Sequence, residues 1–195
     1  MEVLDKGFVE LEEFMGGDNV ILEAGEICTK REASNPLQLI KYMLRSSHNT
    51  CFEHTVFRFR FKAPIFVARQ HMRHRIGTFN ELSGRRVKLI DYYTPVNFLR
   101  PILEVYQAVI EREKEVYNYL LEKGVRKEQA RGILGTAFYT EYIWTVNLWS
   151  LLNWLKKRIA NDAQYEHQRY AFAVLKILGE IDKIKIAMEA INEYL

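Results

Sequence analysis

A chain of 195 residues is long enough for one domain with a sizeable core, and its 48% apolar and 13% aromatic content excludes a disordered protein. No apolar run is long enough to cross a bilayer, so we expect no membrane span. The formal net charge of only +3 argues against a surface that binds nucleic acid as a whole. The 2 cysteines, Cys28 and Cys51, have neither disulfide nor metal-site spacing, which indicates a reduced, cytoplasmic setting and no metal.

Taken in chain order, the apolar spacing predicts strands, helices and loops without a repeat or a linker. The predicted elements are a strand at 7–14, a helix at 18–28, a helix at 36–45, a loop at 46–53, a strand at 56–62, a helix at 63–76, a strand at 86–93, helices at 101–123 and 126–134, a strand at 138–149, helices at 150–158 and 163–178, and a closing amphipathic segment. Asp18 or Asn19 is the predicted cap of the first helix, and Gly124 is the predicted end of the long one. We therefore expect a single domain over residues 1–195.

The strand at 56–62 has the clearest alternation in the chain. Phe57, Phe59 and Phe61 share one face, which predicts their burial in the core. The other face carries Arg58, Arg60 and Lys62. Three cations on one face indicate contact with solvent, with another subunit or with an anionic ligand.

The segment from Arg69 to Arg86 carries the strongest functional signal. It contains five arginines and two histidines but only one acidic residue, Glu81, and its small residues include Ser83 and Gly84. Guanidinium groups bind phosphate through paired, charge-assisted hydrogen bonds, and small residues let a phosphate approach the backbone. This pattern predicts a pocket for a phosphorylated ligand at a helix end, although charge alone is equally compatible with a solvated basic face.

Several motifs resemble segments of one enzyme family. The order Arg73-His74-Arg75, followed after seven residues by Ser83, resembles the signature of the flavin-dependent thymidylate synthases. Similar segments, in family order, are F-E-H at 52–54, K-A-P-I-F-V-A-R-Q at 62–70, N-E-L-S-G-R at 80–85, W-T-V-N at 144–147 and A-Q-Y-E at 163–166. The resemblance covers nearly the whole chain.

This resemblance implies a mixed α/β fold with an antiparallel or mixed sheet flanked by helices, assembled as a homotetramer whose flavin sites are shared between subunits. It implies an enzyme, a methyltransferase that converts dUMP to dTMP. Methylenetetrahydrofolate is the implied carbon donor, FAD the hydride carrier and NADPH its reductant. In this family no cysteine attacks the pyrimidine, and neither Cys28 nor Cys51 has the basic neighbourhood that stabilises a thiolate.

By resemblance, the dUMP site draws on the segment 70–85 and on two distant arginines. The implied dUMP-binding residues are Gln70, His71, Met72, Arg73, Glu81, Leu82, Ser83, Gly84, Arg85, Arg131 and Arg158. Arg73 and Arg85 have the chemistry to hold the phosphate, with Ser83 completing the cradle. Arg158 is the implied catalytic residue, because a fixed cation beside the uracil stabilises its electron-rich form, and the alternative for it is a helix-end cation. Ser83 has no adjacent general base, which argues against a nucleophilic role.

The same resemblance implies FAD-binding residues on several elements. They are Thr50, Glu53, Arg73, His74, Arg75, Glu81, Asn147 and Asn153. His48 matches a family histidine near the approach of folate and NADPH, although an ordinary loop histidine is equally compatible. No G-x-G-x-x-G run is present in the sequence, so we do not expect a Rossmann-type flavin site.

Three positions depart from the family pattern. Trp149 stands where many members carry an arginine, Asp162 where they carry a histidine, and Cys28 where they carry a serine. The first two changes remove cationic or donor groups from the flavin neighbourhood, so a non-catalytic FAD- or nucleotide-binding protein on the same fold is an alternative. A nucleic-acid binder that uses the cationic strand is a third alternative, which the low net charge and Glu81 argue against.

Overall fold

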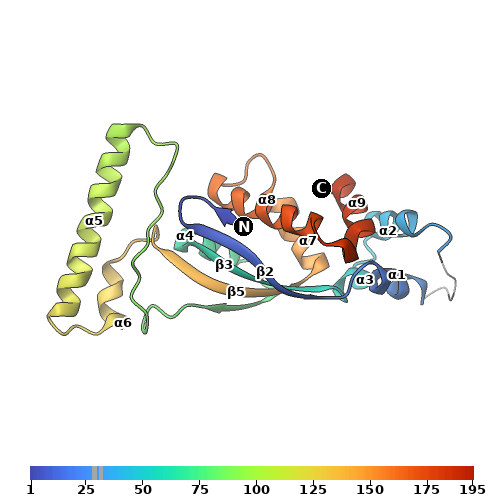
Figure 1. The fold of residues 1–195 in the computed structure, drawn as a ribbon, viewed down its shortest axis with the longest axis horizontal. Coiled ribbons are helices and arrows are strands. Elements are labelled where there is room, and N and C mark those ends of the chain that lie inside the picture. Colours follow the sequence, from blue (N-terminus) through green and yellow to red (C-terminus); the bar gives the residue numbers. More distant parts are fainter. Residues whose placement is uncertain (28–29, 31–32) are drawn as a thin grey trace.

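The computed structural model describes residues 1–27, 30 and 33–195. The strands in these ranges form one sheet in the order β1-β2-β3-β5-β4, and each of their pairings is antiparallel. The strands are β1 (Glu2–Val3), β2 (Gly7–Met15), β3 (Val56–Pro64), β4 (Thr78–Glu81) and β5 (Tyr139–Asn147). The predicted sheet flanked by helices is therefore confirmed, and its pairing is antiparallel (Figure 1).

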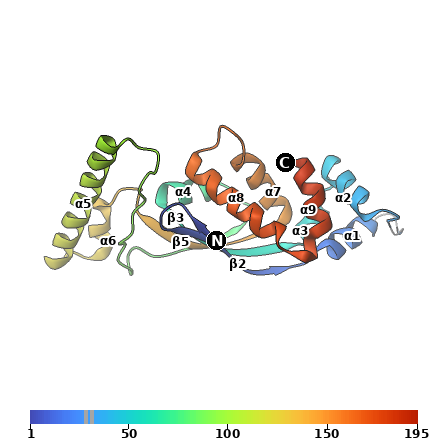
Figure 2. The same ribbon diagram turned by 45° about the horizontal axis from the view of Figure 1, so that its top comes forward.

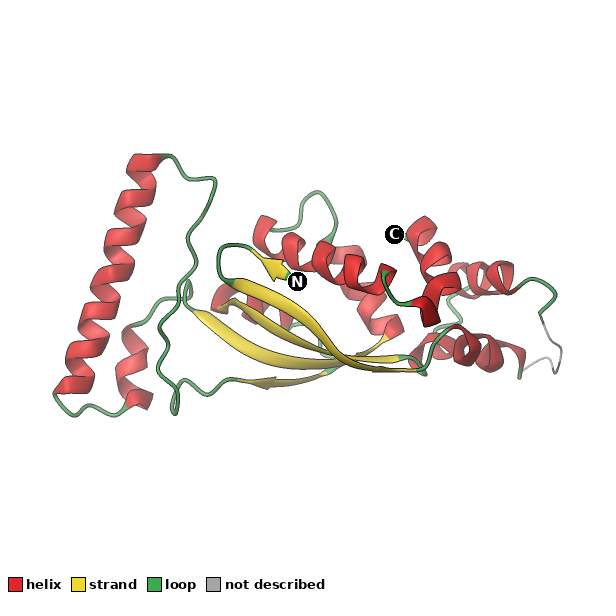
Figure 3. Ribbon diagram, in the orientation of Figure 1, coloured by secondary structure: helices red, strands yellow, loops and turns green. Residues whose placement is uncertain are grey.

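The helices lie over the sheet and beyond its two ends. They are α1 (Asp18–Glu26), α2 (Pro36–Arg45), α3 (Thr50–Glu53), α4 (Ile65–His71), α5 (Arg100–Glu122), α6 (Lys127–Ala130), α7 (Leu148–Arg158), α8 (Tyr165–Gly179) and α9 (Lys185–Tyr194), with short 3-10 turns at Arg131–Ile133 and Asp182–Ile184. Figure 1 and Figure 2 show α7 and α8 over the sheet, α1 to α3 at one end with α9, and α5 and α6 at the other end. Figure 3 shows that extended connections link α5 and α6 to the sheet, so these two helices project from the main body.

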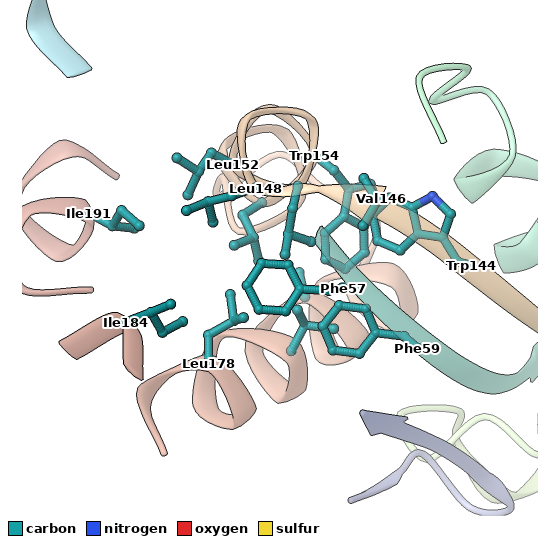
Figure 4. Close-up of a cluster of buried hydrophobic side chains, with 14 of the residues drawn as sticks. Phe57, Phe59, Trp144, Val146, Leu148, Leu152, Trp154, Leu178, Ile184 and Ile191 are labelled. Atoms are coloured by element: carbon teal, nitrogen blue, oxygen red, sulfur yellow. The ribbon is translucent and has the colours of Figure 1, made fainter. Parts of the chain in front are cut away.

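The core lies between the sheet and the helices α7, α8 and α9. Phe57, Phe59 and Phe61 are fully buried, as their alternation predicts, and β5 places Trp144 and Val146 among them. Figure 4 shows Phe57, Phe59, Trp144 and Val146 gathered with leucines of α7 and α8. Each large apolar side chain that is fully buried stabilises the fold by about 1.5–3 kcal/mol, so β3 and β5 anchor the domain.

Each cation on the opposite face of β3 has a carboxylate partner within the chain. The pairs are Arg58 with Glu12 at 2.9 Å, Arg60 with Glu141 at 2.8 Å, and Lys62 with Asp91 at 2.6 Å. Because the carboxylates neutralise these cations, this face offers no uncompensated cationic strip to a polyanion. The cationic face of β3 therefore no longer supports the alternative of a nucleic-acid binder.

The chain between residues 63 and 93 differs from the prediction. The predicted helix at 63–76 ends at His71, because the chain has to turn before Thr78 enters the sheet as the first residue of β4. β4 then takes the edge position beside β5. The predicted strand at 86–93 is therefore wrong, and among the described residues this segment forms only an isolated bridge, between Tyr92 and Phe138.

Smaller differences concern the first half of the chain. The predicted loop at 46–53 contains the single helical turn α3. The predicted end of the first helix, at Cys28, lies outside the described residues. The long helix ends as predicted, since Gly124 follows α5 with a φ of 80°, which favours glycine.

Asp18 ties the two ends of the chain together. The sequence predicts it as a cap for α1, but its carboxylate instead accepts hydrogen bonds from the backbone N–H groups of Ile186 and Ala187, both at 2.8 Å. These N–H groups belong to the first turn of α9, where they have no partners within the helix. Asp18 is only 7% exposed, so its negative charge meets the positive end of the helix dipole out of water.

Replacing Asp18 with Ala should lower the free energy of unfolding by about 1–3 kcal/mol, because two backbone donors lose their shielded acceptor. Urea denaturation followed by circular dichroism measures the change. Asn35→Ala is the matched control, since it removes an exposed cap that accepts from Gln38 N, and it should cost about 1 kcal/mol or less. Equal losses in the two variants would contradict the role given to burial.

Candidate functional site

The first group of candidate residues lies where the loop after β4 meets α6. Ser83, Arg85, Arg86 and Glu128 line a cavity of about 420 Å³. Arg85 donates to Oε2 of Glu128 from Nε at 3.2 Å and from Nη2 at 3.0 Å. The Arg85 side chain is 65% exposed, so this ion pair is weak and open to exchange with an anion from solvent.

Arg131 joins this group from the 3-10 turn after α6. A Cβ placed on Gly84 would lie 3.2 Å from Nη1 of Arg131, so the guanidinium group packs directly against the glycine. A larger side chain at position 84 would press on Arg131. The structure thus brings together four of the predicted dUMP residues, namely Ser83, Gly84, Arg85 and Arg131.

Arg158 and His74 form a second group at the end of α7. Nη2 of Arg158 donates to Nε2 of His74 at 3.0 Å, and because arginine has no acceptor, His74 carries its own proton on Nδ1. Burial, with the charges of Arg158 and Lys157, lowers the pKa of His74 to about 4. Nε of Arg158 is buried and has no partner in the described part of the chain, so this fixed cation retains an unused donor.

The register of the sheet explains how residues so far apart in sequence meet. Pro64, at the end of β3, pairs with Tyr139 at the start of β5, whereas Asn147 at the end of β5 pairs with Val56. The helix α7 begins at the Val56 end and runs back over the sheet. Its 11 residues span about 16 Å, which carries Arg158 toward the turn that follows α4.

A chain of hydrogen bonds runs through the core behind this second group. Nε1 of Trp154 donates to Nε2 of His167 at 3.1 Å, and Nδ1 of His167 donates to Oε1 of Gln70 at 2.5 Å. Trp154 and His167 are fully buried, and burial, with the charges of Arg158 and His74, lowers the pKa of His167 to about 3. Of the predicted dUMP residues, Gln70 is the one that belongs to this series of hydrogen bonds.

The side chain of His71 lies in the core. It is 1% exposed, its Nδ1 is hydrogen-bonded to the Tyr142 hydroxyl at 2.7 Å, and its ring stacks on Trp154 with centroids 4.9 Å apart. Burial lowers the pKa of His71 well below its usual value. The His71 side chain is therefore turned into the core, and Met72 beside it is also half-buried against the core, so the assignment of both residues to the dUMP site stays a prediction.

His48 and Thr50 belong to a third group, away from the other two. They line a cavity of about 900 Å³, together with residues of α1, α2 and α3. The ring of His48 is exposed and meets the ring of Tyr42 edge-on, with centroids 5.6 Å apart. Glu53, the last residue of α3, is exposed but is not among the described residues that line this cavity.

The other predicted residues lie on the surface or at element ends. Arg73 and Arg75 are exposed in the turn after α4, and neither has a carboxylate partner among the described residues. Oε1 of Glu81 accepts from Oγ1 of Thr140 at 2.8 Å, while Leu82 is 36% exposed. Asn147 caps α7, its Oδ1 accepting from Ser150 N at 2.8 Å, and Asn153 is exposed on the same helix.

The three departures from the family pattern have different surroundings. Trp149 is half-buried, with its ring centroid 6.1 Å from that of the buried Phe52, so it packs on the core at the start of α7. Asp162 is exposed in the turn between α7 and α8. Cys28 lies outside the described residues.

Sequence reasoning missed four residues that support the site: Glu128, Tyr142, Trp154 and His167. Glu128 comes from a distant helix, and nothing in one sequence pairs it with Arg85. Trp154 and His167 sit at helical spacing among apolar residues and therefore read as core. The available signal is His167 itself, because a histidine on an apolar helix face needs hydrogen-bond partners when it is buried.

The described residues offer cations, neutral histidines and amide donors, which together suit anionic and carbonyl oxygens. No cluster of three or more His, Cys, Asp or Glu side chains suited to a metal ion occurs within residues 1–27, 30 and 33–195. Across the same ranges, every helix is too short or too polar to cross a bilayer.

Fold and site together define an α/β protein whose surface presents clustered arginines. Residues 10–182 match the family model described as thymidylate synthase complementing protein. The flavin-dependent thymidylate synthase of Thermotoga neapolitana is 43% identical over 190 residues, which cover 91% of this chain and 88% of the relative. The enzyme of the same name from Thermus thermophilus is 38% identical over 216 residues, which cover 99% and 78%. The chain therefore belongs to the flavin-dependent thymidylate synthase family, as its motifs predict.

A solved structure shows the same fold. It is the crystal structure of a UMP/dUMP methylase, PolB, from Streptomyces cacaoi, bound with 5-Br dUMP. The TM-score is 0.88, with 99% of this chain and 97% of that chain covered at 24% sequence identity. Because the coverage is nearly complete, the projecting helices α5 and α6 are part of the shared fold.

The free energy of unfolding should fall as the pH is lowered from about 6.5 to about 4. His71, His74 and His167 have lowered pKa values when folded, so over this interval the unfolded chain binds more protons than the folded one. Their contribution is complete above pH about 6.5 and is lost on acidification. Urea denaturation across this interval measures it.

The variant His167→Asn is the control for this pH dependence, since it removes one of the three buried imidazoles. It should lose less stability than the wild type between pH about 6.5 and about 4. An unchanged slope would exclude His167 as a contributor.

Proposed function

We propose that this chain catalyses the reductive methylation of dUMP to dTMP, with methylenetetrahydrofolate as the carbon donor, FAD as the hydride carrier and NADPH as the reductant. The observation that carries the proposal is the 43% identity, over 91% of the chain, to a protein named flavin-dependent thymidylate synthase. The sparing use of cysteine fits a reducing, cytoplasmic setting. The neighbour bound with 5-Br dUMP has the same fold and adds support for a pyrimidine nucleotide as the substrate.

Arg85, Arg131 and Ser83 are the proposed phosphate-binding residues. In the free chain Arg85 pairs with Glu128, and that exposed pair is weak enough for a dianionic phosphate to replace it. Gly84 permits the close packing that holds Arg131 beside the loop. The hydroxyl of Ser83 has no hydrogen-bond partner among the described residues, and in particular no base, which supports a binding role over a nucleophilic one.

Arg158 is the proposed catalytic residue. Its contact with the neutral His74 leaves the guanidinium charge uncompensated, because no carboxylate pairs with it in the described part of the chain. A fixed cation in a partly buried site favours negative charge that develops on a pyrimidine oxygen. Such charge makes uracil C5 nucleophilic without a covalent bond from the protein.

FAD fits the cationic turn after α4. Arg73 and Arg75 are exposed and without carboxylate partners among the described residues, as a pyrophosphate requires. Further polar groups are His74 in the same turn, Asn147 at the end of β5 and Asn153 on α7. When bound, the flavin supplies the hydride that completes the methyl group. Thr50 and His48 are proposed to contact the cofactors from the cavity of about 900 Å³.

A homotetramer is the proposed assembly. The projecting helix α5 exposes an apolar face, on which Ile102, Val105 and Val109 are 54%, 67% and 55% exposed and a shallow cavity reaches Ile133. Apolar patches of this kind mark interaction surfaces. The separation of the three groups of candidate residues within one chain is a second reason, since a shared site would bring groups of different subunits together.

The alternative is a non-catalytic nucleotide or FAD binder on the same fold. The observation that favours it is Trp149, whose ring packs against Phe52 at the position where the motif resemblance implies an arginine in many members. This alternative predicts that the protein binds dUMP without converting it, whereas the proposed enzyme activity predicts the formation of dTMP.

The purified protein, mixed anaerobically with dUMP, methylenetetrahydrofolate, FAD and NADPH, should form dTMP and release tritium from C5-labelled dUMP. Arg158→Ala should lower kcat roughly 100- to 1000-fold, because the developing charge loses its cation. Arg85→Ala should mainly weaken dUMP binding, by roughly 10- to 100-fold, through the phosphate. Lys176→Ala, exposed on α8, is the control and should leave both parameters unchanged. Bound dUMP and FAD with no dTMP would instead establish the non-catalytic alternative.

Light scattering coupled to size-exclusion chromatography should give the mass of four 23.1 kDa chains. The double variant Val105→Glu and Val109→Glu should dissociate the assembly, because two carboxylates would be buried without partners. Lys123→Glu, at the exposed residue directly after the same helix, is the control for charge and should stay tetrameric. A tetramer that survives both glutamates would place the interface elsewhere.

A further inference from the structure

The hydrogen bonds from Trp154 to Gln70 have only one possible direction. The indole Nε1 can only donate, so Nε2 of His167 must accept at 3.1 Å. A neutral imidazole that accepts on Nε2 carries its proton on Nδ1. That N–H then donates to the atom of Gln70 lying 2.5 Å away, which must be the carbonyl oxygen Oε1.

The opposite arrangement is unfavourable because the pair is buried. Trp154 and His167 are both 0% exposed, so a proton on Nε2 would set two donors against each other out of water. The rings are also held in place by packing. The ring of His71 stacks on Trp154 with centroids 4.9 Å apart, and Trp144 meets Trp154 edge-on at 5.4 Å.

The consequence falls on the amide group of Gln70. With Oε1 occupied on the buried side, Nε2 points away from His167. It has no hydrogen-bond partner among the described residues and is not one of their fully buried unpartnered atoms. Gln70 lies one residue before the end of α4, and its partner His167 is close enough to Arg158 and His74 for their charges to lower its pKa.

We propose that Trp154 and His167 are positioning residues that hold Gln70 with its NH₂ group toward the bound nucleotide. At this position the NH₂ group of Gln70 thereby donates to an oxygen of the phosphate or of the pyrimidine, and it cannot bond an amino group, which is also a donor. This inference rests on the proposed function for its ligand. Burial, with the charges of Arg158 and His74, keeps the His167 imidazole neutral, which preserves the single direction of these hydrogen bonds.

The first test is a double-mutant cycle on dUMP affinity, measured by isothermal titration calorimetry with Trp154→Phe and Gln70→Ala. Trp154→Phe removes the donor that fixes the tautomer of His167, so the amide group of Gln70 can rotate by 180°. We expect roughly 3- to 10-fold weaker dUMP binding. In the Gln70→Ala background the same change should have almost no further effect, because the positioned group is absent. A purely structural role for Trp154 predicts the same loss in both backgrounds.

Trp144→Phe is the matched control. Nε1 of Trp144 is buried without a partner, so this substitution also removes an indole from the core but breaks no hydrogen bond. It should weaken dUMP binding much less than Trp154→Phe does, and an equal loss in Trp144→Phe and Trp154→Phe would overturn the proposal. Repeating the cycle with deoxyuridine, which lacks the phosphate, distinguishes the two oxygens: a coupling that persists assigns the pyrimidine, and one that disappears assigns the phosphate.

A measurement on the wild-type protein needs no ligand. Long-range ¹H–¹⁵N NMR of histidine-labelled protein should show His167 protonated on Nδ1 at neutral pH, and the Nε2 tautomer would overturn the proposal. If His167 has the expected tautomer and the wild type does not bind dUMP, the proposed function fails. If the wild type binds dUMP and the cycle shows no coupling, the positioning role fails alone.

Discussion

The pairing of β3 with β5 is the constraint on which the rest of the structure depends. The phenylalanine face of β3 is buried only because α7 and α8 pack on it. The register of β3 and β5 then determines where the helix that follows each strand begins. β3 runs directly into α4, and β5 runs directly into α7. The two helices that carry Gln70 and Arg158 are therefore placed by the apolar alternation of two strands, and neither needs a loop to set its position.

The polar groups behind Arg158 are unusual for a core. His71, His167 and Trp154 are buried together, and each imidazole is neutral because burial lowers its pKa. Within this network, the bonds from Trp154 to His167 and from His167 to Gln70 have one required direction, so they stabilise a single arrangement of these side chains. The network restrains the side chains packed on it, so Gln70 and Arg158 would lose little side-chain freedom when the proposed ligand binds.

The surface groups follow a different rule. Arg73, Arg75 and Arg85 are exposed, and their only described carboxylate partner is Glu128. Hydrated, weakly paired cations exchange partners readily, which suits the proposed binding of an anionic ligand by these arginines. The projecting helix α5 keeps Val105 and Val109 exposed, because no other described segment of the chain covers them.

By itself, the sequence determined the elements whose signals are local. The alternation of Phe57, Phe59 and Phe61 predicts β3, Pro36 predicts the start of α2, and Gly124 predicts the end of α5, because backbone propensity and side-chain period act over a few residues. Its motifs also determined the family. Only the tertiary structure decided that β4 displaces the predicted strand at 86–93, since the edge of a sheet is filled by whichever segment reaches it.

The tertiary structure also decided which polar groups meet. Asp18 caps α9, Glu128 pairs with Arg85, and His167 bonds Gln70, and in each case the partners lie on different elements. No local pattern encodes such pairs, because a hydrogen bond depends on the distance and direction between groups, and these are set only when the elements pack.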